Sequence, residues 1–135
     1  MENFVTAQCP SGWVQHESLC YFFSHDAATW EEAAGTCKAF NTKLAEPETY
    51  SAAHFITGKA QEKHQPFWIG VTDMMVDDEW IYPSDLRQIL ITNWGPGEPN
   101  QHTGANCVTT WVPHNSRWAD EPCQQRYRFI CEKST

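Results

Sequence analysis

The feature that most constrains this chain is a set of six cysteines spread over almost its whole length. Their number is even and no Cys-x-x-Cys pair occurs, which disfavours zinc or thioredoxin-like redox chemistry and favours three disulfides. Because disulfides persist in oxidising compartments, we expect a secreted, extracellular protein. Residues Met1–Phe4 lack the features of a secretory signal, so we expect that signal to have been removed before the numbering begins. Spacing alone does not choose among the fifteen pairings that six cysteines allow.

The length and the net charge of the chain limit the number of domains and the kinds of partner that we expect. With 135 residues, of which 41% are hydrophobic, the chain is expected to form a single domain over residues 1–135 with one core. The net charge of -8 repels phosphate backbones, so we expect no nucleic-acid partner. No apolar run approaches the roughly 18–20 residues that a membrane-spanning helix needs, so we expect no membrane insertion.

Hydrophobic periodicity predicts two helices in the first half of the chain. Thr29 and Glu32 match a capping box and apolar residues follow at helical spacing, which predicts a helix over residues 29–40. A second helix is expected to open at Glu46-Pro47, with the proline at the first helical position, and to stop at Gly58.

Outside these helices the pattern is that of short strands and polar loops. A short hairpin over residues 13–22, stapled at its base by Cys9 and Cys20, is expected near the start of the chain. Four β-type runs follow the helices, at residues 67–71, 80–82, 108–112 and 128–131. Trp111, in the third run, is expected in the core. The stretch from about residue 73 to 105 has little strand signal, and a loop region of that length usually carries function. The predicted fold class is α+β, with the helices first.

Several short motifs follow one another in a fixed order: Trp68-Ile69-Gly70-Val71-Thr72-Asp73, Trp94-Gly95-Pro96-Gly97-Glu98-Pro99-Asn100, Cys107-Val108, Trp118-Ala119-Asp120 with Cys123, and Phe129-Ile130-Cys131-Glu132. Together they resemble the signature of C-type lectin-like domains, and the resemblance runs from Cys9 to Glu132. It implies the long form of that fold, with two helices packed on small antiparallel sheets and a long ligand-binding loop region. It also implies the disulfides Cys9–Cys20, Cys37–Cys131 and Cys107–Cys123, which leave no cysteine to link subunits.

The tripeptide Glu98-Pro99-Asn100 carries the main functional expectation. A cis peptide bond at Pro99 would turn a carboxylate and an amide toward one point, and with Asp120 these are ligands that suit calcium. The resemblance implies that Glu98, Asn100 and Asp120 hold the principal calcium ion and that adjacent sugar hydroxyls bond to the same side chains. The order Glu-Pro-Asn implies sugars with equatorial 3- and 4-hydroxyls, such as mannose, fucose or N-acetylglucosamine. An ordinary polar turn is the alternative for the tripeptide in isolation.

Two residues of the implied calcium site differ from the family pattern. Ala105 and Ala119 replace two side-chain ligands, so we expect a weakened or calcium-independent site. Candidates to fill the gap are Asn106, Gln101, Asn115 or water, and Asn106 is also a candidate to contact the sugar. His102 and His114 fall in the flanking loops, where an imidazole can donate to a hydroxyl or stack on a ring face, although a plain surface position is the commoner one. His102 is taken as a candidate sugar ligand.

An acidic group follows the Trp-Ile-Gly run. Asp73 and Asp77 match the family's auxiliary calcium site, and Asn106 is a candidate third ligand. Calcium there would order loops without touching sugar. A solvated acidic turn is an equal alternative.

These features predict a lectin that recognises microbial or cell-surface glycans. We do not expect an enzyme, because the sequence contains no recognisable nucleophile with its base, no zinc-protease helix and, once the six cysteines pair, no free thiol. The rival is a C-type lectin-like protein with a degenerate sugar site that binds a protein or ice, which Ala105 and Ala119 favour. One shallow site binds weakly, so useful recognition needs several sites, and we expect a non-covalent homodimer or higher oligomer.

Overall fold

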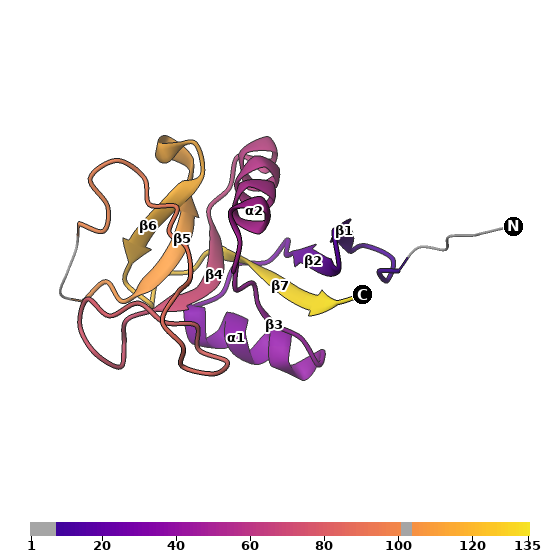
Figure 1. Cartoon of the computed structure of the whole chain (residues 1–135), viewed down its shortest axis with the longest axis horizontal. Helices are drawn as coiled ribbons and strands as arrows, with labels where there is room; N and C mark the ends of the chain where they lie inside the picture. The colour runs from indigo at the N-terminus through magenta and orange to yellow at the C-terminus, as the bar shows by residue number, and fades with distance from the viewer. Residues whose placement is uncertain (1–7, 101–103) are drawn as a thin grey trace, which may run out of the picture.

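The two α-helices lie in the first half of the chain, and the larger part of the sheet comes from the second half. The computed structural model describes residues 8–100 and 104–135. Its elements are β1 (Val14–His16), β2 (Leu19–Phe23), α1 (Trp30–Ala39), β3 (Lys43–Leu44), α2 (Tyr50–Lys63), β4 (Phe67–Thr72), β5 (Cys107–Trp111), the short 3-10 helix η1 (Val112–His114), β6 (Arg117–Glu121) and β7 (Arg128–Ser134) (Figure 1).

Strand β4 lies at the centre of the sheet and is buried at every position. Within the described residues the strands form one seven-stranded sheet in the order β1-β2-β7-β4-β5-β6, and β3 pairs with β7 outside that path. The β4–β7 pair is parallel and the other pairs are antiparallel, so the sheet is mixed. The predicted α+β class is confirmed, with the difference that the sheet is not purely antiparallel.

Helix α1 forms as its sequence predicts. The Thr29 side chain accepts the Glu32 backbone N–H at 3.2 Å, and the Glu32 carboxylate accepts the Thr29 N–H at 3.1 Å, so the capping box is complete. Trp30, Ala33 and Cys37 are buried on one face. This face packs toward β3, β7 and β4, which fixes one side of the core.

Helix α2 begins and ends later than its sequence predicts. Thr49 is the N-cap and accepts the Ala52 N–H at 3.0 Å, whereas the predicted start at Glu46-Pro47 is not helical. Glu46 is instead committed to tertiary hydrogen bonds of its backbone and side chain. The predicted stop at Gly58 is also wrong, because Gly58 lies inside the helix, which ends at His64 in the left-handed conformation with φ 54°.

The strand predictions are correct for the central runs, wrong for residues 80–82, and they omit both β3 and β6. Residues 80–82 form only isolated bridges, through Ile81, and no strand. Strand β6 had no signal in the sequence, because its residues Arg117–Glu121 are mostly polar, yet it pairs with β5 along its whole length. Trp111 is half-buried rather than fully in the core, and its ring lies 5.9 Å from that of Tyr127.

The three disulfides implied by the family resemblance are all present. Cys9–Cys20 closes the β1–β2 region, Cys37–Cys131 joins α1 to β7, and Cys107–Cys123 joins β5 to the segment after β6. The largest fully buried side chains include Trp68, Trp118, Tyr21 and Tyr82. Among the described residues, no helix is both long and apolar enough to cross a membrane.

Candidate functional site

The segment after β4 returns to the sheet beside β6. The Trp118 N–H donates to the Asn93 carbonyl at 2.9 Å, and the Gly95 N–H donates to the Trp118 carbonyl at 2.8 Å. The Trp94 ring packs edge-on between Trp80 and Trp118, with centroid distances of 5.0 and 5.7 Å. This attachment places the residues that follow Gly95 next to the middle of β6.

The predicted residues Glu98, Asn100 and Asp120 lie together at this position. The Glu98–Pro99 peptide bond is cis. The Asn100 Nδ2 donates to Glu98 Oε2 at 3.1 Å, and the Asn100 backbone N–H donates to Asp120 Oδ1 at 3.0 Å. The carboxylate and the amide therefore lie side by side above β6. The predicted His102 lies outside the described residues.

A histidine completes this cluster. His114, the last residue of η1, has its Nε2 at 3.1 Å from Glu98 Oε2. Because an ionised carboxylate only accepts hydrogen bonds, the imidazole donates. Sequence reasoning placed His114 in a flanking loop but did not pair it with Glu98, because the contact depends on how η1 folds against the loop rather than on any local spacing.

The two carboxylates of this cluster are largely buried, whereas Asn100 is exposed. The Glu98 side chain is only 5% exposed and Asp120 is fully buried. Burial, and then the neighbouring Asp120 carboxylate, raise the pKa of Glu98 above its usual range, while the hydrogen bond from His114 opposes this rise. Glu98 Oε1 is buried and has no hydrogen-bond partner among the described residues. A cation or a proton at this oxygen would relieve the cost of burying it.

The described donors fit calcium only in part. Calcium takes about six to eight oxygen ligands, and the orphaned Glu98 Oε1 is of the right kind. Ala105 and Ala119, at the two positions where the family resemblance implies side-chain ligands, are each 1% exposed and bring only methyl groups. The donors that the described side chains bring here, from Glu98, Asn100 and Asp120, do not complete a calcium shell.

A second acidic cluster lies in the loop that follows β4. Carboxylate oxygens of Asp73, Asp77 and Asp78 all lie within 4.8 Å of one another. The Asp73 Oδ1 is buried without a hydrogen-bond partner among the described residues, and burial first, then Asp77 and Asp78, raise the pKa of Asp73. The predicted Asn106 lies here through its carbonyl, which accepts the Asp73 N–H at 3.1 Å. Asp78 joins the predicted pair.

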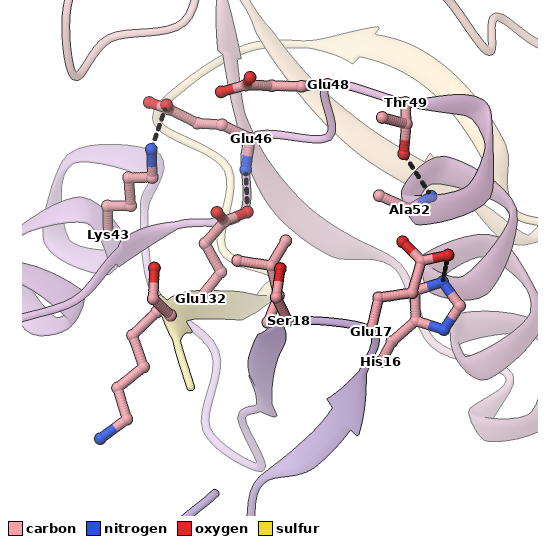
Figure 2. A pocket seen from close by; sticks show the side chains of 12 residues that line it. His16, Glu17, Ser18, Lys43, Glu46, Glu48, Thr49, Ala52 and Glu132 are labelled. Carbon is pink, nitrogen blue, oxygen red and sulfur yellow. Dashed lines mark hydrogen bonds and ion pairs between the residues drawn. The ribbon is translucent and has the colours of Figure 1, made fainter. Parts of the chain in front are cut away.

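A pocket of about 360 Å³ lies between the β1–β2 turn, β3 and the start of α2 (Figure 2). Two of the residues that line it, Glu46 and Glu132, are buried carboxylates. The Glu46 N–H donates to Glu132 Oε1 at 2.8 Å, and Lys43 Nζ lies 2.9 Å from Glu46 Oε1. Burial raises the pKa of Glu132 to about 7, although the hydrogen bond from the Glu46 N–H and then the charge of Lys43 oppose the shift. No sequence motif indicates this buried network, because its members lie far apart along the chain.

Comparison with protein families matches residues 26–133 to the Lectin C-type domain. Perlucin of Haliotis laevigata is 33% identical over 129 residues, which cover 93% of this chain and 83% of perlucin. Human asialoglycoprotein receptor 2 is 34% identical over 133 residues, which cover 93% of this chain but only 40% of the receptor. The chain belongs to the C-type lectin domain family.

Solved structures agree with that assignment. The mouse scavenger receptor C-type lectin carbohydrate-recognition domain superposes with a TM-score of 0.86 at 27% identity, covering 93% of this chain and 96% of that one. The carbohydrate-recognition domain of cow CD23, solved in the presence of a GlcNAc2Man3 oligosaccharide, gives 0.84 at 28% identity, covering 95% and 97%. A calcium-independent type II antifreeze protein gives 0.84 at 25% identity, covering 98% of each chain.

Proposed function

We propose that this protein is a carbohydrate-binding lectin whose site is formed by Glu98 and Asn100, with Asp120 beneath them. The observation that carries the proposal is the placement of the Glu98 carboxylate beside the Asn100 amide, 3.1 Å apart. The family assignment and the similarity to carbohydrate-recognition domains support a binding role rather than a catalytic one.

The order of the two side chains defines the sugar class of this proposal. The carboxylate accepts from one hydroxyl and the amide donates to its neighbour, an arrangement that suits vicinal equatorial 3- and 4-hydroxyls. Mannose, fucose and N-acetylglucosamine present that pair. The solved relative with a GlcNAc2Man3 oligosaccharide is in keeping with this class.

Calcium enters the proposal as a weakly held ion. Glu98, Asn100 and Asp120 would hold it at the sugar site, and it would neutralise the buried carboxylates there. Asp73, Asp77 and Asp78, with Asn106 nearby, are the proposed auxiliary site, where an ion would order the loop. The buried Asp73 Oδ1 supports that second assignment.

The disulfides support a proposed compartment for the protein, and the shallow site supports a proposed oligomeric state. Three disulfides favour a secreted, extracellular protein that meets microbial or cell-surface glycans. A site that grips two hydroxyls is expected to bind a monosaccharide with Kd near 1 mM, so a non-covalent dimer or larger assembly would supply avidity.

A second candidate is a domain whose sugar site has decayed and whose surface binds a protein or ice. The buried methyl groups of Ala105 and Ala119 favour it, because they remove ligands for calcium. The similarity to a calcium-independent type II antifreeze protein favours it as well.

A glycan array separates the two candidates. The lectin should bind mannose-type glycans, and exchanging Glu98→Gln together with Asn100→Asp should move the preference toward galactose, because donor and acceptor trade places. The exposed Glu62→Gln on α2 is the control and should leave the preference unchanged. Absence of glycan binding both with calcium and with EDTA would favour the protein or ice surface, and an unaltered preference in the exchanged variant would place the contacts elsewhere.

A further inference from the structure

The ring of His114 is fixed against the loop by a glycine. A Cβ atom added to Gly95 would lie 2.5 Å from His114 Cγ and 2.6 Å from its Cδ2, closer than side-chain atoms approach one another in proteins. Gly95 is itself held by its hydrogen bond to the Trp118 carbonyl. The His114 ring can therefore occupy this position only because residue 95 has no side chain.

The backbone that carries His114 is also anchored. Asn115 and Ser116 both have positive φ, 55° and 64°, and the Asn115 N–H closes the turn onto the Val112 carbonyl at 3.0 Å. Ser116 is fully buried, and its hydroxyl donates to Gln61 Oε1 on α2 at 2.7 Å. The η1 turn is thus tied to a helix and presents the imidazole in one position.

That position faces the carboxylate of the proposed sugar site. His114 Nε2 and Asn100 Nδ2 both lie 3.1 Å from Glu98 Oε2. Glu98 is also held through its backbone, whose N–H donates to the Gly95 carbonyl at 3.0 Å. Where the family uses metal ligands, Ala105 and Ala119 offer no polar atom of their side chains.

We propose that His114 is a positioning residue that holds the Glu98 carboxylate for sugar binding in place of a tightly bound metal, so that sugar recognition persists without calcium. The inference rests on the proposed lectin function. A neutral imidazole carries one N–H, which is all that the contact requires. Gly95 contributes to the same positioning, because its missing side chain leaves space for the His114 ring.

The test measures binding to mannose-coated beads, once with calcium and once with EDTA. Wild type should keep its affinity in EDTA to within about twofold, whereas His114→Ala and Gly95→Ala should lose at least about tenfold, the effect of losing a hydrogen bond to a charged group. His114→Gln retains an amide donor and should recover most of the binding. Matched controls are His54→Ala and Gly58→Ala on α2, since His54 is exposed and a Cβ at Gly58 meets nothing within 4 Å.

The outcomes distinguish this inference from the function on which it rests. Binding that disappears in EDTA, or His114→Ala binding that equals wild type in EDTA, would overturn the role of His114 and leave the lectin function standing. Absence of binding under both conditions would overturn both. Thermal unfolding of each variant confirms that it is folded before its affinity is compared.

Discussion

Among the described residues, the carboxyl groups of Asp73, Glu98 and Glu132 are nearly removed from water, and burial is the first cause of the raised pKa of each. Two of them also have an oxygen without a hydrogen-bond partner in the described part of the chain. Such groups destabilise a fold when ionised and unpaired. Two lie in the loop region where ligands are proposed, and the third lies in the pocket between β3 and α2.

Glu132 gives a pH-dependent prediction. Its folded pKa of about 7 exceeds the ordinary value of 4.5, so its favourable contribution to stability is complete below about pH 4.5 and is lost as the pH rises through 7. Glu132→Gln keeps an acceptor for the Glu46 N–H but cannot ionise. The variant should match wild type near pH 4.5 and exceed it at pH 8 by roughly 3 kcal/mol in the free energy of unfolding.

Urea unfolding of both proteins at several pH values measures this difference. The exposed Glu62→Gln removes a carboxylate outside any pocket and controls for net charge. A stability advantage of Glu132→Gln that shrinks as the pH rises would contradict the assignment.

The start of α2 contributes Thr49 and Ala52 to the lining of this pocket. Thr49 accepts the Ala52 N–H and thereby ends the extended segment that carries Glu46. Thr49→Ala should lower the free energy of unfolding by about 1 kcal/mol, while Thr49→Ser keeps the hydroxyl and should lose little. Equal losses in the two variants, measured by urea unfolding, would show that the cap hydroxyl contributes nothing.

The two helices also show how far sequence patterns reach. Helix α1 was predictable because Thr29 and Glu32 satisfy each other locally. The start of α2 was not, because Glu46 bonds to Glu132, which is 86 residues away, and this contact keeps the segment extended. Gly58 did not stop the helix because glycine only weakens a helix whose other face is buried.

The same distinction applies to the candidate site. Glu98, Asn100 and Asp120 could be named from their motifs, because the family resemblance fixes their order along the chain. His114 could not be paired with Glu98, because its place depends on the left-handed backbone at Asn115 and on the space beside Gly95. Neither feature can be predicted from the sequence alone.

The disulfides should differ in how much each contributes to the free energy of unfolding. Cys37–Cys131 spans 94 residues and Cys9–Cys20 only 11. Because the entropy removed from the unfolded chain grows with loop length, Cys37→Ala with Cys131→Ala should cost about 4–5 kcal/mol, and Cys9→Ala with Cys20→Ala about 3 kcal/mol. Denaturant unfolding of both double variants measures this, and a larger loss for the shorter loop would contradict it.

Strand β7 ends at the C-terminus on one side of Figure 1, and the orange loop segment before β5 lies on the opposite side. A tag placed after Thr135 would therefore anchor the molecule on the side opposite this loop segment. Copies fixed to a flat support in this way would all turn their loops toward the solution. A coated sensor surface or nanoparticle would then act as a multivalent reagent, with the spacing between copies set by the coating density rather than by any natural assembly.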